Sequence, residues 1–302
     1  MLVWSRSGRW SAWGIAALLL GVFYILPLAV IALASLAGQW NGALPSHLTL
    51  RHYADALQGD SGAELRVSLL TGLMASFLAL LSGSWAALSL RGVMPASRRF
   101  LDVVFFLPSA VPSVSVGLGL LVAFSRPPVL LNGTTTIVVL AHFILVSAFT
   151  YGNVSAGLAR LSPDYEQIAA SLGARPFYLL RRVTLPLVAP YLIAAFSLSF
   201  AMSMGELGAT VMVYPPGWVT LPVGIFALTD RGEVFGGAAL TILLVAVTLV
   251  VLLGLSRIPT KASASRSLAR GFCCPLYLPT TPESSSIDPI IGIVRCVERS
   301  SK

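Results

Sequence analysis

Residues 234–256 read VFGGAALTILLVAVTLVVLLGLS, a run without a single charged side chain. A helix rises about 1.5 Å per residue, so on the order of 20 apolar residues cross the roughly 30 Å hydrocarbon core of a bilayer. This run therefore predicts a membrane-spanning helix. Over the whole chain of 302 residues, 56% are apolar and 11% are charged, whereas soluble domains carry roughly 25% charged residues. We expect an all-α, polytopic membrane protein.

Apolar runs and the residues that interrupt them divide the chain into six predicted spans. The spans lie at about residues 13–37, 67–90, 101–124, 134–157, 187–212 and 234–256. Pro27 falls inside the first span, and Pro108 and Pro112 fall inside the third, which a membrane helix tolerates where its neighbours satisfy the freed carbonyls. Residues 1–12 are a predicted cytoplasmic N-terminus. Residues 259–302, rich in Ser, Arg and Pro, predict a poorly structured tail.

The arginines predict the orientation, because cytoplasmic loops carry an excess of basic residues. With a cytoplasmic N-terminus, the inner segments before the tail hold Arg6, Arg9, Arg91, Arg98, Arg99, Arg160, Arg175, Arg181 and Arg182. The outer segments hold Arg51, Arg66, Arg126 and Arg231. Both termini are therefore expected in the cytoplasm. Since topology explains the basic excess, the lipid bilayer is an expected partner and nucleic acid is not.

The N-terminal run also allows a different interpretation. Arg6 and Arg9 before an apolar stretch, with ALA at 32–34, resemble a signal peptide and its cleavage site. The run from Trp13 to Leu36 is longer than a typical signal core, so we expect an uncleaved first helix.

The predicted cytoplasmic segment between the fourth and fifth spans contains SPDYEQIAASLG at residues 162–173. Ser162 suits a helix N-cap, Pro163 the first helical position, and Gly173 the left-handed residue that ends a helix. A second short helix is predicted from Pro176, stopping before Pro186 because proline disfavours helical geometry in the residue ahead of it. This elbow would offer apolar side chains to a partner protein: Tyr165, Ile168, Leu172, Phe177 and Leu180. A simple connector is the alternative.

The elbow resembles the "EAA" coupling loop of binding-protein-dependent ABC permeases, whose signature is Glu-Ala-Ala, three residues, Gly, nine residues, Ile-x-Leu-Pro. Gly173 and the VTLP at 183–186 match this spacing. Gln167 and Ile168 stand where the family has Glu and Ala, Ala169 matches, and Glu166 can supply the missing charge. The resemblance implies a loop that sits in a cleft of an ATPase subunit. Its coupling residues would be Glu166, Gln167, Ala169, Gly173, Val183, Leu185 and Pro186.

Other segments extend this resemblance over roughly residues 1–258, without the tail. FLPSAVPSV at 106–114 resembles the third-span region of the superfamily. MGELGAT at 204–210 and the loop YPPGWVTLP at 214–222 resemble permeases of the oxyanion group, and within it most closely those of 2-aminoethylphosphonate importers. Molybdate and sulfate permeases are the alternatives within the group.

The resemblance implies a type I ABC importer permease fold in the bacterial inner membrane. It also implies the partners of such a chain: a cytoplasmic ATPase dimer, a second and related permease subunit, and a periplasmic substrate-binding protein.

Glu206 is the only carboxylate well inside a predicted span, and such a group by default faces the bundle interior or water. On one continuous helix, Ser199, Ser203, Glu206 and Thr210 would share a face. Ser109 and Ser113 would stack in the same way on the third span. We expect these six residues to line a translocation path. Alternatively, Glu206 caps or clamps a helix, and the serines bond their own carbonyls.

Several enzyme chemistries lack their motifs. Lys261 and Lys302 are the only lysines, and neither stands in a phosphate-binding loop, so an ATPase must be a separate polypeptide and no enzyme activity is expected. The three histidines form no metal motif, and the cysteines all follow the last span, so neither metal, cofactor nor disulfide framework is expected.

Two other classes of protein are weaker candidates. A secondary transporter should show inverted repeats, which we do not find. An intramembrane hydrolase would use His142 with a serine, the nearest candidate being GNVSAG at 152–157. We expect His142 to be a hydrogen-bonding group of the bundle and not a proton carrier.

Overall fold

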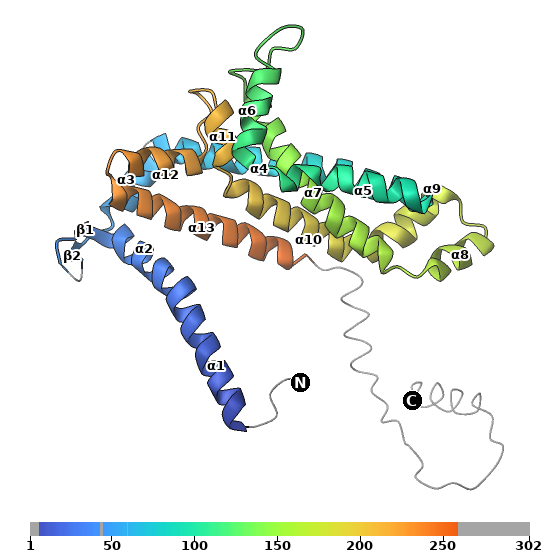
Figure 1. Cartoon of the computed structure of the whole chain (residues 1–302), viewed down its shortest axis with the longest axis horizontal. Coiled ribbons are helices and arrows are strands. Elements are labelled where there is room, and N and C mark those ends of the chain that lie inside the picture. Colours follow the sequence, from blue (N-terminus) through green and yellow to red (C-terminus); the bar gives the residue numbers. More distant parts are fainter. Residues whose placement is uncertain (1–5, 43–44, 59, 259–302) are drawn as a thin grey trace, which may run out of the picture. The chain divides into compact units, whose positions relative to one another are not determined.

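The computed structural model describes residues 6–42, 45–58 and 60–258, and most of these residues are helical (Figure 1). Five helices are long and apolar enough to cross a membrane, and there are six if the bent pair α5 and α6 forms one span. The predicted all-α, polytopic fold is confirmed. The predicted tail at 259–302, with its cysteines and lysines, lies outside the described residues, as do residues 1–5 of the predicted N-terminal segment.

The N-terminal third contains the first two membrane helices and a small hairpin between them. Its elements are α1 (Arg6–Leu20), a π-helical turn (Gly21–Ile25), α2 (Leu26–Leu36), β1 (Ala37–Gln39), β2 (Ser46–Leu48), α3 (Arg51–Gln58) and α4 (Asp60–Ser89). Strands β1 and β2 pair antiparallel, with Ala37 opposite Leu48. The π-helical turn ends two residues before Pro27, which lacks a backbone N–H and stands in the first turn of α2.

The rest of the described chain is helical apart from its connections. It comprises α5 (Pro95–Ala110), α6 (Ser113–Ala123), α7 (Thr135–Ala159), α8 (Pro163–Ser171), α9 (Pro176–Leu179), a π-helical turn (Leu180–Thr184), α10 (Leu185–Met204), α11 (Gly208–Val213), α12 (Leu221–Asp230) and α13 (Val234–Ser256). A 3₁₀ turn at Leu90–Gly92 ends α4. Helices α3 and α12 were not predicted from the sequence.

Helix α7 forms the centre of the bundle, with α4 and α10 packed along it. The side of α4 that is buried carries small residues, namely Gly72, Ala75, Ser76, Ala79 and Gly83. A Cβ on Gly83 would lie 3.0 Å from Thr150 of α7, so the missing side chain permits the two backbones to approach closely. Small residues at such contacts are typical of membrane helices, whose packing depends on close van der Waals contact.

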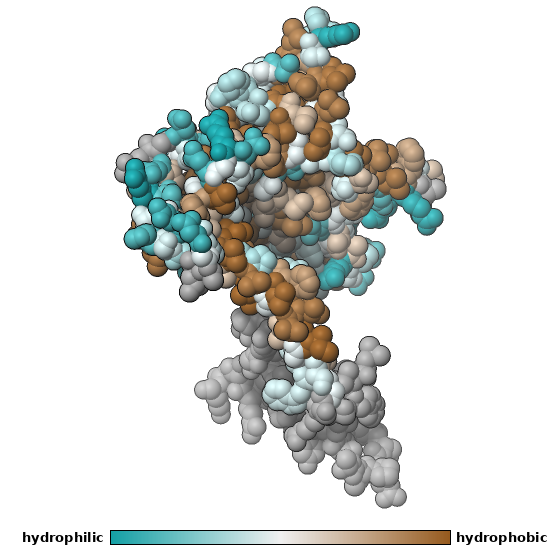
Figure 2. Space-filling model, turned by 60° about the vertical axis from the view of Figure 1, so that its left-hand side comes forward, coloured by the Kyte–Doolittle hydropathy of each residue, from teal (hydrophilic) through white to brown (hydrophobic). Residues whose placement is uncertain are grey.

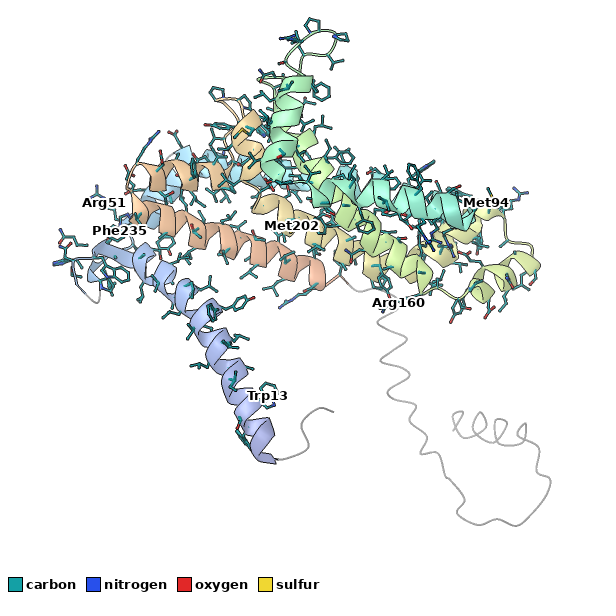
Figure 3. All side chains as sticks on the ribbon, viewed as in Figure 1. Trp13, Arg51, Met94, Arg160, Met202 and Phe235 are labelled. Atoms are coloured by element: carbon teal, nitrogen blue, oxygen red, sulfur yellow. The ribbon has the colours of Figure 1, made fainter. Side chains whose placement is uncertain are left out.

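Large apolar side chains are exposed on the outer faces of the membrane helices. None of the apolar window in the first membrane helix is buried, and Trp13 is 74% exposed (Figure 3). Trp85 of α4 and Val250 of α13 are likewise exposed. Hydrophobic residues are prominent on the face shown in Figure 2, with hydrophilic residues gathered mainly to one side. Such a surface suits contact with lipid or with other membrane helices.

The third predicted span, 101–124, is not one continuous helix. Helices α5 and α6 meet at Val111 and Pro112 with a bend of 98°. Val111 is extended, with φ −94° and ψ 134°, as expected for a residue that precedes a proline. Ser109 and Ser113 therefore lie on different helices, and the predicted stacking on one helix face was wrong.

The fifth predicted span, 187–212, is also broken. Helix α10 ends at Met204, and α11 starts at Gly208 after a short non-helical link. The expectation that Ser199, Ser203, Glu206 and Thr210 share one continuous helix face was therefore wrong. Glycines at both ends of the link lower the cost of leaving the helix, because glycine is a poor helix former.

Candidate translocation pathway and coupling segment

The elbow at 162–186, which is predicted to lie in the cytoplasm, begins with the N-cap that its sequence predicts. The Ser162 hydroxyl accepts a hydrogen bond from the Asp164 N–H at 3.4 Å and donates one to the Asp164 carboxylate at 2.8 Å. Helix α8 ends at Ser171, and Gly173, two residues further along the chain, has the left-handed φ of +84° that was predicted. The Gly173 N–H bonds the Ala170 carbonyl and the Ala174 N–H bonds the Ala169 carbonyl, the paired closure of a Schellman motif.

The second arm of the elbow differs from the prediction, because it does not stop before Pro186. Helix α9, the π-helical turn and α10 follow one another without a break, so that 176–204 counts as one helix. In the π-helical turn, the Leu185 N–H bonds the Leu180 carbonyl five residues back. The wider turn accommodates Pro186 in the first turn of α10. As a result, the elbow runs directly into the fifth membrane helix.

Both arms of the elbow expose apolar side chains. Tyr165, Ile168 and Leu172 of the first arm are 56%, 59% and 83% exposed, and Phe177 and Tyr178 of the second arm are also exposed. Of the residues predicted to offer apolar contacts, only Leu180 is half-buried. Exposed apolar clusters of this kind mark interaction sites more often than free surface.

Glu166 points to the other side, into the protein. Its Oε1 accepts hydrogen bonds from Arg91 Nη1 at 2.7 Å and from the Thr184 hydroxyl at 2.8 Å. Burial raises the pKa of Glu166, but the two hydrogen bonds and the charge of Arg91 lower it more strongly, so the net pKa lies below its ordinary value. Glu166 is therefore ionised at neutral pH. The sequence did not predict this contact. It indicated Arg91 only as a basic residue that helps to set the orientation, and Thr184 only as part of the family signature.

The other predicted coupling residues differ in exposure. Gln167 is exposed and Leu185 is at the border of exposure, while Ala169, Val183 and Pro186 are half-buried. Gly173 lies at the tip of the elbow, and a Cβ there would meet nothing within 4 Å. The substitution of Gln for the family's Glu thus falls on the exposed side of α8, whereas Glu166 takes an internal position.

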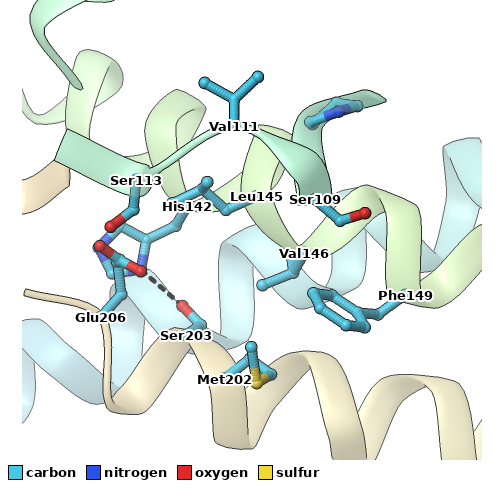
Figure 4. Close-up of a pocket in the computed structure, with 11 residues that line it drawn as sticks. Ser109, Val111, Ser113, His142, Leu145, Val146, Phe149, Met202, Ser203 and Glu206 are labelled. Atoms are coloured by element: carbon cyan, nitrogen blue, oxygen red, sulfur yellow. Dashed lines mark hydrogen bonds between the residues drawn. The ribbon is translucent and has the colours of Figure 1, made fainter. Parts of the chain in front are cut away.

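A cavity of about 160 Å³ lies where α5, α6, α7 and α10 meet (Figure 4). Four of the six predicted path residues line it, namely Ser109, Ser113, Ser203 and Glu206. His142 lines it as well, and Phe149 and Met202 contribute to its apolar wall. The bend between α5 and α6 brings Ser109 and Ser113 to this cavity from two different helices.

The remaining two predicted path residues are buried in helix contacts. Ser199 bonds the Thr150 hydroxyl at 2.7 Å, joining α10 to α7. Thr210 bonds His142 Nε2 at 2.8 Å, and Ser203 bonds His142 Nδ1 at 2.6 Å. His142 therefore holds the hydroxyl groups on both sides of the break between α10 and α11, in agreement with its predicted role as a hydrogen-bonding group of the bundle.

Glu206 combines features of both interpretations of its role. Its Oε1 accepts the backbone N–H of Ala209 at 2.9 Å, which satisfies a free donor in the first turn of α11. Its side chain also lines the cavity. Ser109 bonds back to the carbonyl of Phe106, as the structural alternative predicted, whereas Ser203 bonds to another helix.

The serine suggested for the hydrolase alternative, Ser155, does not pair with His142. Ser155 and His142 stand on the same helix, α7, about 20 Å apart along its axis. Among the described residues, the hydroxyl groups bonded to His142 come from Ser203 and Thr210.

Comparison with known proteins places the chain in a family. Residues 75–260 match the family described as "Binding-protein-dependent transport system inner membrane component". The chain belongs to this family of permeases. The match contains α4 from its middle onward, the cavity and the elbow.

Relatives of this family member share its sequence over most of its length. A Salmonella paratyphi A protein, provisionally named the 2-aminoethylphosphonate transport system permease protein PhnV, is 58% identical over 86% of this chain and 98% of its own length. The molybdenum transport system permease protein ModB of Mycobacterium bovis is 31% identical over 77% of this chain and 88% of its own.

Solved structures show the same fold at low sequence identity. A chain of the bacterial alginate ABC transporter, in complex with its pentasaccharide-bound periplasmic protein, superposes with a TM-score of 0.68 at 18% identity, covering 85% of this chain and 96% of the other. A chain of the inward-facing MetNI methionine ABC transporter gives 0.53 at 17% identity, covering 65% and 93%. The type I ABC importer permease fold is thus confirmed.

Proposed function

We propose that this family member is the permease subunit of an ATP-driven importer that carries 2-aminoethylphosphonate across the bacterial inner membrane. The observation that carries the choice of substrate is the 58% identity to PhnV over 98% of that protein. Both termini lie in the cytoplasm in this proposal, because that orientation places most arginines of the loops on the inner side.

The working complex would contain a second permease subunit, a cytoplasmic ATPase dimer and a periplasmic binding protein. The exposed apolar face of the elbow, with Tyr165, Ile168 and Leu172, supports docking of an ATPase subunit there. The continuity of the elbow with α10 supports a mechanical role, since a displacement of the elbow moves the fifth membrane helix with it.

Alternating access then follows from two states of the complex. ATP binding closes the ATPase dimer and moves the elbow, and the membrane helices open toward the periplasm. The loaded binding protein releases its cargo into the path, which in this proposal includes the cavity beside Glu206. Hydrolysis restores the inward-facing state.

A molybdate permease is the second candidate function, because ModB of Mycobacterium bovis is 31% identical. Uptake by cells separates the candidates. Cells with and without this gene should be given labelled 2-aminoethylphosphonate, molybdate and sulfate in parallel. We expect only phosphonate uptake to depend on the gene. If only molybdate or sulfate uptake depends on the gene, that anion becomes the proposed substrate in place of 2-aminoethylphosphonate. Unchanged uptake of all three compounds would refute the proposed substrate class.

A further inference from the structure

We propose that Arg91, through Glu166, ties the elbow to the second membrane helix, so that movement of the elbow drives α4 as well as α10. Arg91 is a positioning residue in this view, and the inference rests on the proposed function. The supporting observation is a junction of three chain segments at one carboxylate oxygen. Arg91 lies in the turn that ends α4, Glu166 in α8, and Thr184 in the turn that begins α10.

The junction is partly withdrawn from solvent, which favours a lasting contact. The side chains of Arg91 and Glu166 are 28% and 24% exposed, and Thr184 is 2% exposed. The exposed pair Arg51 and Asp55, by comparison, has side chains that are 83% and 69% exposed, with a separation of 3.7 Å. Ion pairs in water contribute little, whereas charge-assisted hydrogen bonds at 2.7–2.9 Å in a sheltered site are stronger.

The position of the junction leaves the docking face of the elbow free. Tyr165 and Ile168 are exposed on either side of Glu166 in the sequence, while Glu166 itself faces α4. A partner can therefore engage the apolar face without displacing the ion pair. The elbow is continuous with α10 along the chain, whereas the bond from Arg91 to Glu166 links its first arm directly to the end of α4.

Helix α4 can transmit such a movement across the membrane. At its other end, Ser68 accepts the Leu221 N–H at 2.7 Å and Thr71 accepts the Trp218 indole N–H at 2.9 Å. These contacts hold the segment that leads into α12. Arg91 thus connects the elbow to α4. At its other end, this helix is hydrogen-bonded to the segment between the fifth and sixth membrane helices.

The test uses the complete complex in liposomes, with uptake and ATP hydrolysis measured in the same vesicles. Arg91→Met and Glu166→Gln remove the ion pair, and the double variant Arg91→Glu with Glu166→Arg exchanges the charges. Arg99→Met, at an exposed arginine of α5, is the matched control. We expect each single variant to lower the substrate carried per ATP about tenfold, the size of a typical coupling between sites. The double variant with exchanged charges should restore most of the substrate carried per ATP, and the Arg99→Met control should leave this ratio unchanged.

A second measurement does not depend on the substrate. Spin labels at Ser171 of α8 and Ser89 of α4, both exposed, report their separation, after Cys273, Cys274 and Cys296 are replaced by serine. In the wild type, the distribution of distances between the two labels should stay narrow and unchanged through the ATP cycle. In Arg91→Met, this distribution should broaden when ATP is added.

The outcomes separate the two proposals. An unchanged label separation in Arg91→Met, or a charge exchange as poorly coupled as the single variants, would overturn the role of Arg91. A wild-type complex that carries no phosphonate would refute the proposed substrate, and the label measurement would still decide the role of Arg91.

Discussion

Single polar residues determine how the interior of this membrane bundle is held together. His142 is 2% exposed, and both of its ring nitrogens are bonded to hydroxyl groups, one from α10 and one from α11. Glu206 bonds the first turn of α11 from the link between those helices. An unsatisfied backbone or side-chain group is costly in hydrocarbon, so these bonds allow the helix to break at membrane depth.

The cap formed by Glu206 predicts a loss of stability when its acceptor is removed. In Glu206→Ala, the Ala209 N–H loses its partner, and the loss of a cap costs about 0.5–2 kcal/mol. Glu206→Gln keeps an oxygen acceptor and should be much closer to the wild type. Thermal unfolding of the purified protein in detergent measures the difference.

Ser109→Ala is the control for this comparison, because the Ser109 hydroxyl is exposed and bonds only its own helix at Phe106. We expect its midpoint of unfolding to match the wild type. If Glu206→Ala unfolds at the same temperature as Glu206→Gln, the capping role of Glu206 is wrong.

The broken helices are the main feature at the scale of secondary-structure elements. Helices α6 and α11 follow the two breaks and pack against each other beside α7. A Cβ on Gly117 of α6 would lie 2.7 Å from the carbonyl oxygen of Ala209 in α11. A contact with backbone atoms cannot be relieved by rotating a side chain, so the two broken segments fit only with glycine at this position.

Gly117→Ala should therefore destabilise the protein, whereas Gly119→Ala should not. A Cβ on Gly119, two residues further along α6, would meet nothing within 4 Å. Overpacking of a well-packed contact costs typically 1–3 kcal/mol. We expect a lower midpoint of thermal unfolding and less protein in the membrane fraction for Gly117→Ala only. Equal behaviour of the two variants would show that α6 and α11 do not pack as described.

A substitution at the tip of the elbow should impair transport without reducing the amount of protein in the membrane. Gly173 has a φ of +84°, which costs roughly 1–2 kcal/mol in a residue with a side chain, and open space surrounds it. Gly173→Leu should distort the turn and present a bulky group to the ATPase. We expect uptake to fall at least tenfold while the amount in the membrane stays normal.

Gly254→Leu provides the matched control for the elbow. Gly254 lies near the end of α13 in a helical conformation, and a Cβ there also meets nothing within 4 Å. Its uptake should equal that of the wild type. Transport at a normal rate by Gly173→Leu would remove the coupling role from this turn.

The elements could be predicted from sequence where the signal is local. Hydropathy identified the membrane helices, and Ser162 and Gly173 identified the ends of α8, because caps and left-handed glycines depend on a few neighbouring residues. The bend at Pro112 and the break after Met204 could not be predicted, because proline and glycine permit a break without requiring it. Whether a break forms depends on tertiary contacts such as that of Gly117 with Ala209.

The geometry of the candidate site also depends on tertiary contacts, so the sequence predicted its residues better than their arrangement. Ser109, Ser113, Ser203 and Glu206 were predicted as a group and do line one cavity, although by a different geometry from the one expected. The bond between Arg91 and Glu166 joins residues 75 positions apart, and no spacing rule indicates it. Long-range polar contacts require the packed structure.

At the scale of the whole molecule, the bundle has a packed centre and an apolar exterior. Helix α7 is buried over much of its length, whereas the first membrane helix has no buried residue in its apolar window. The exposed apolar faces and the elbow point to a subunit that works within a larger membrane complex. The family assignment agrees with this view.

The most direct test of the proposed function is uptake by the purified complex in liposomes. The complex should contain this permease, its proposed second permease subunit, the ATPase and the binding protein, with labelled 2-aminoethylphosphonate outside. We predict uptake that requires both ATP and the binding protein and that disappears when this chain carries Gly173→Leu. Uptake that proceeds without ATP, or no uptake by a complex that hydrolyses ATP in response to its binding protein, would contradict the proposal.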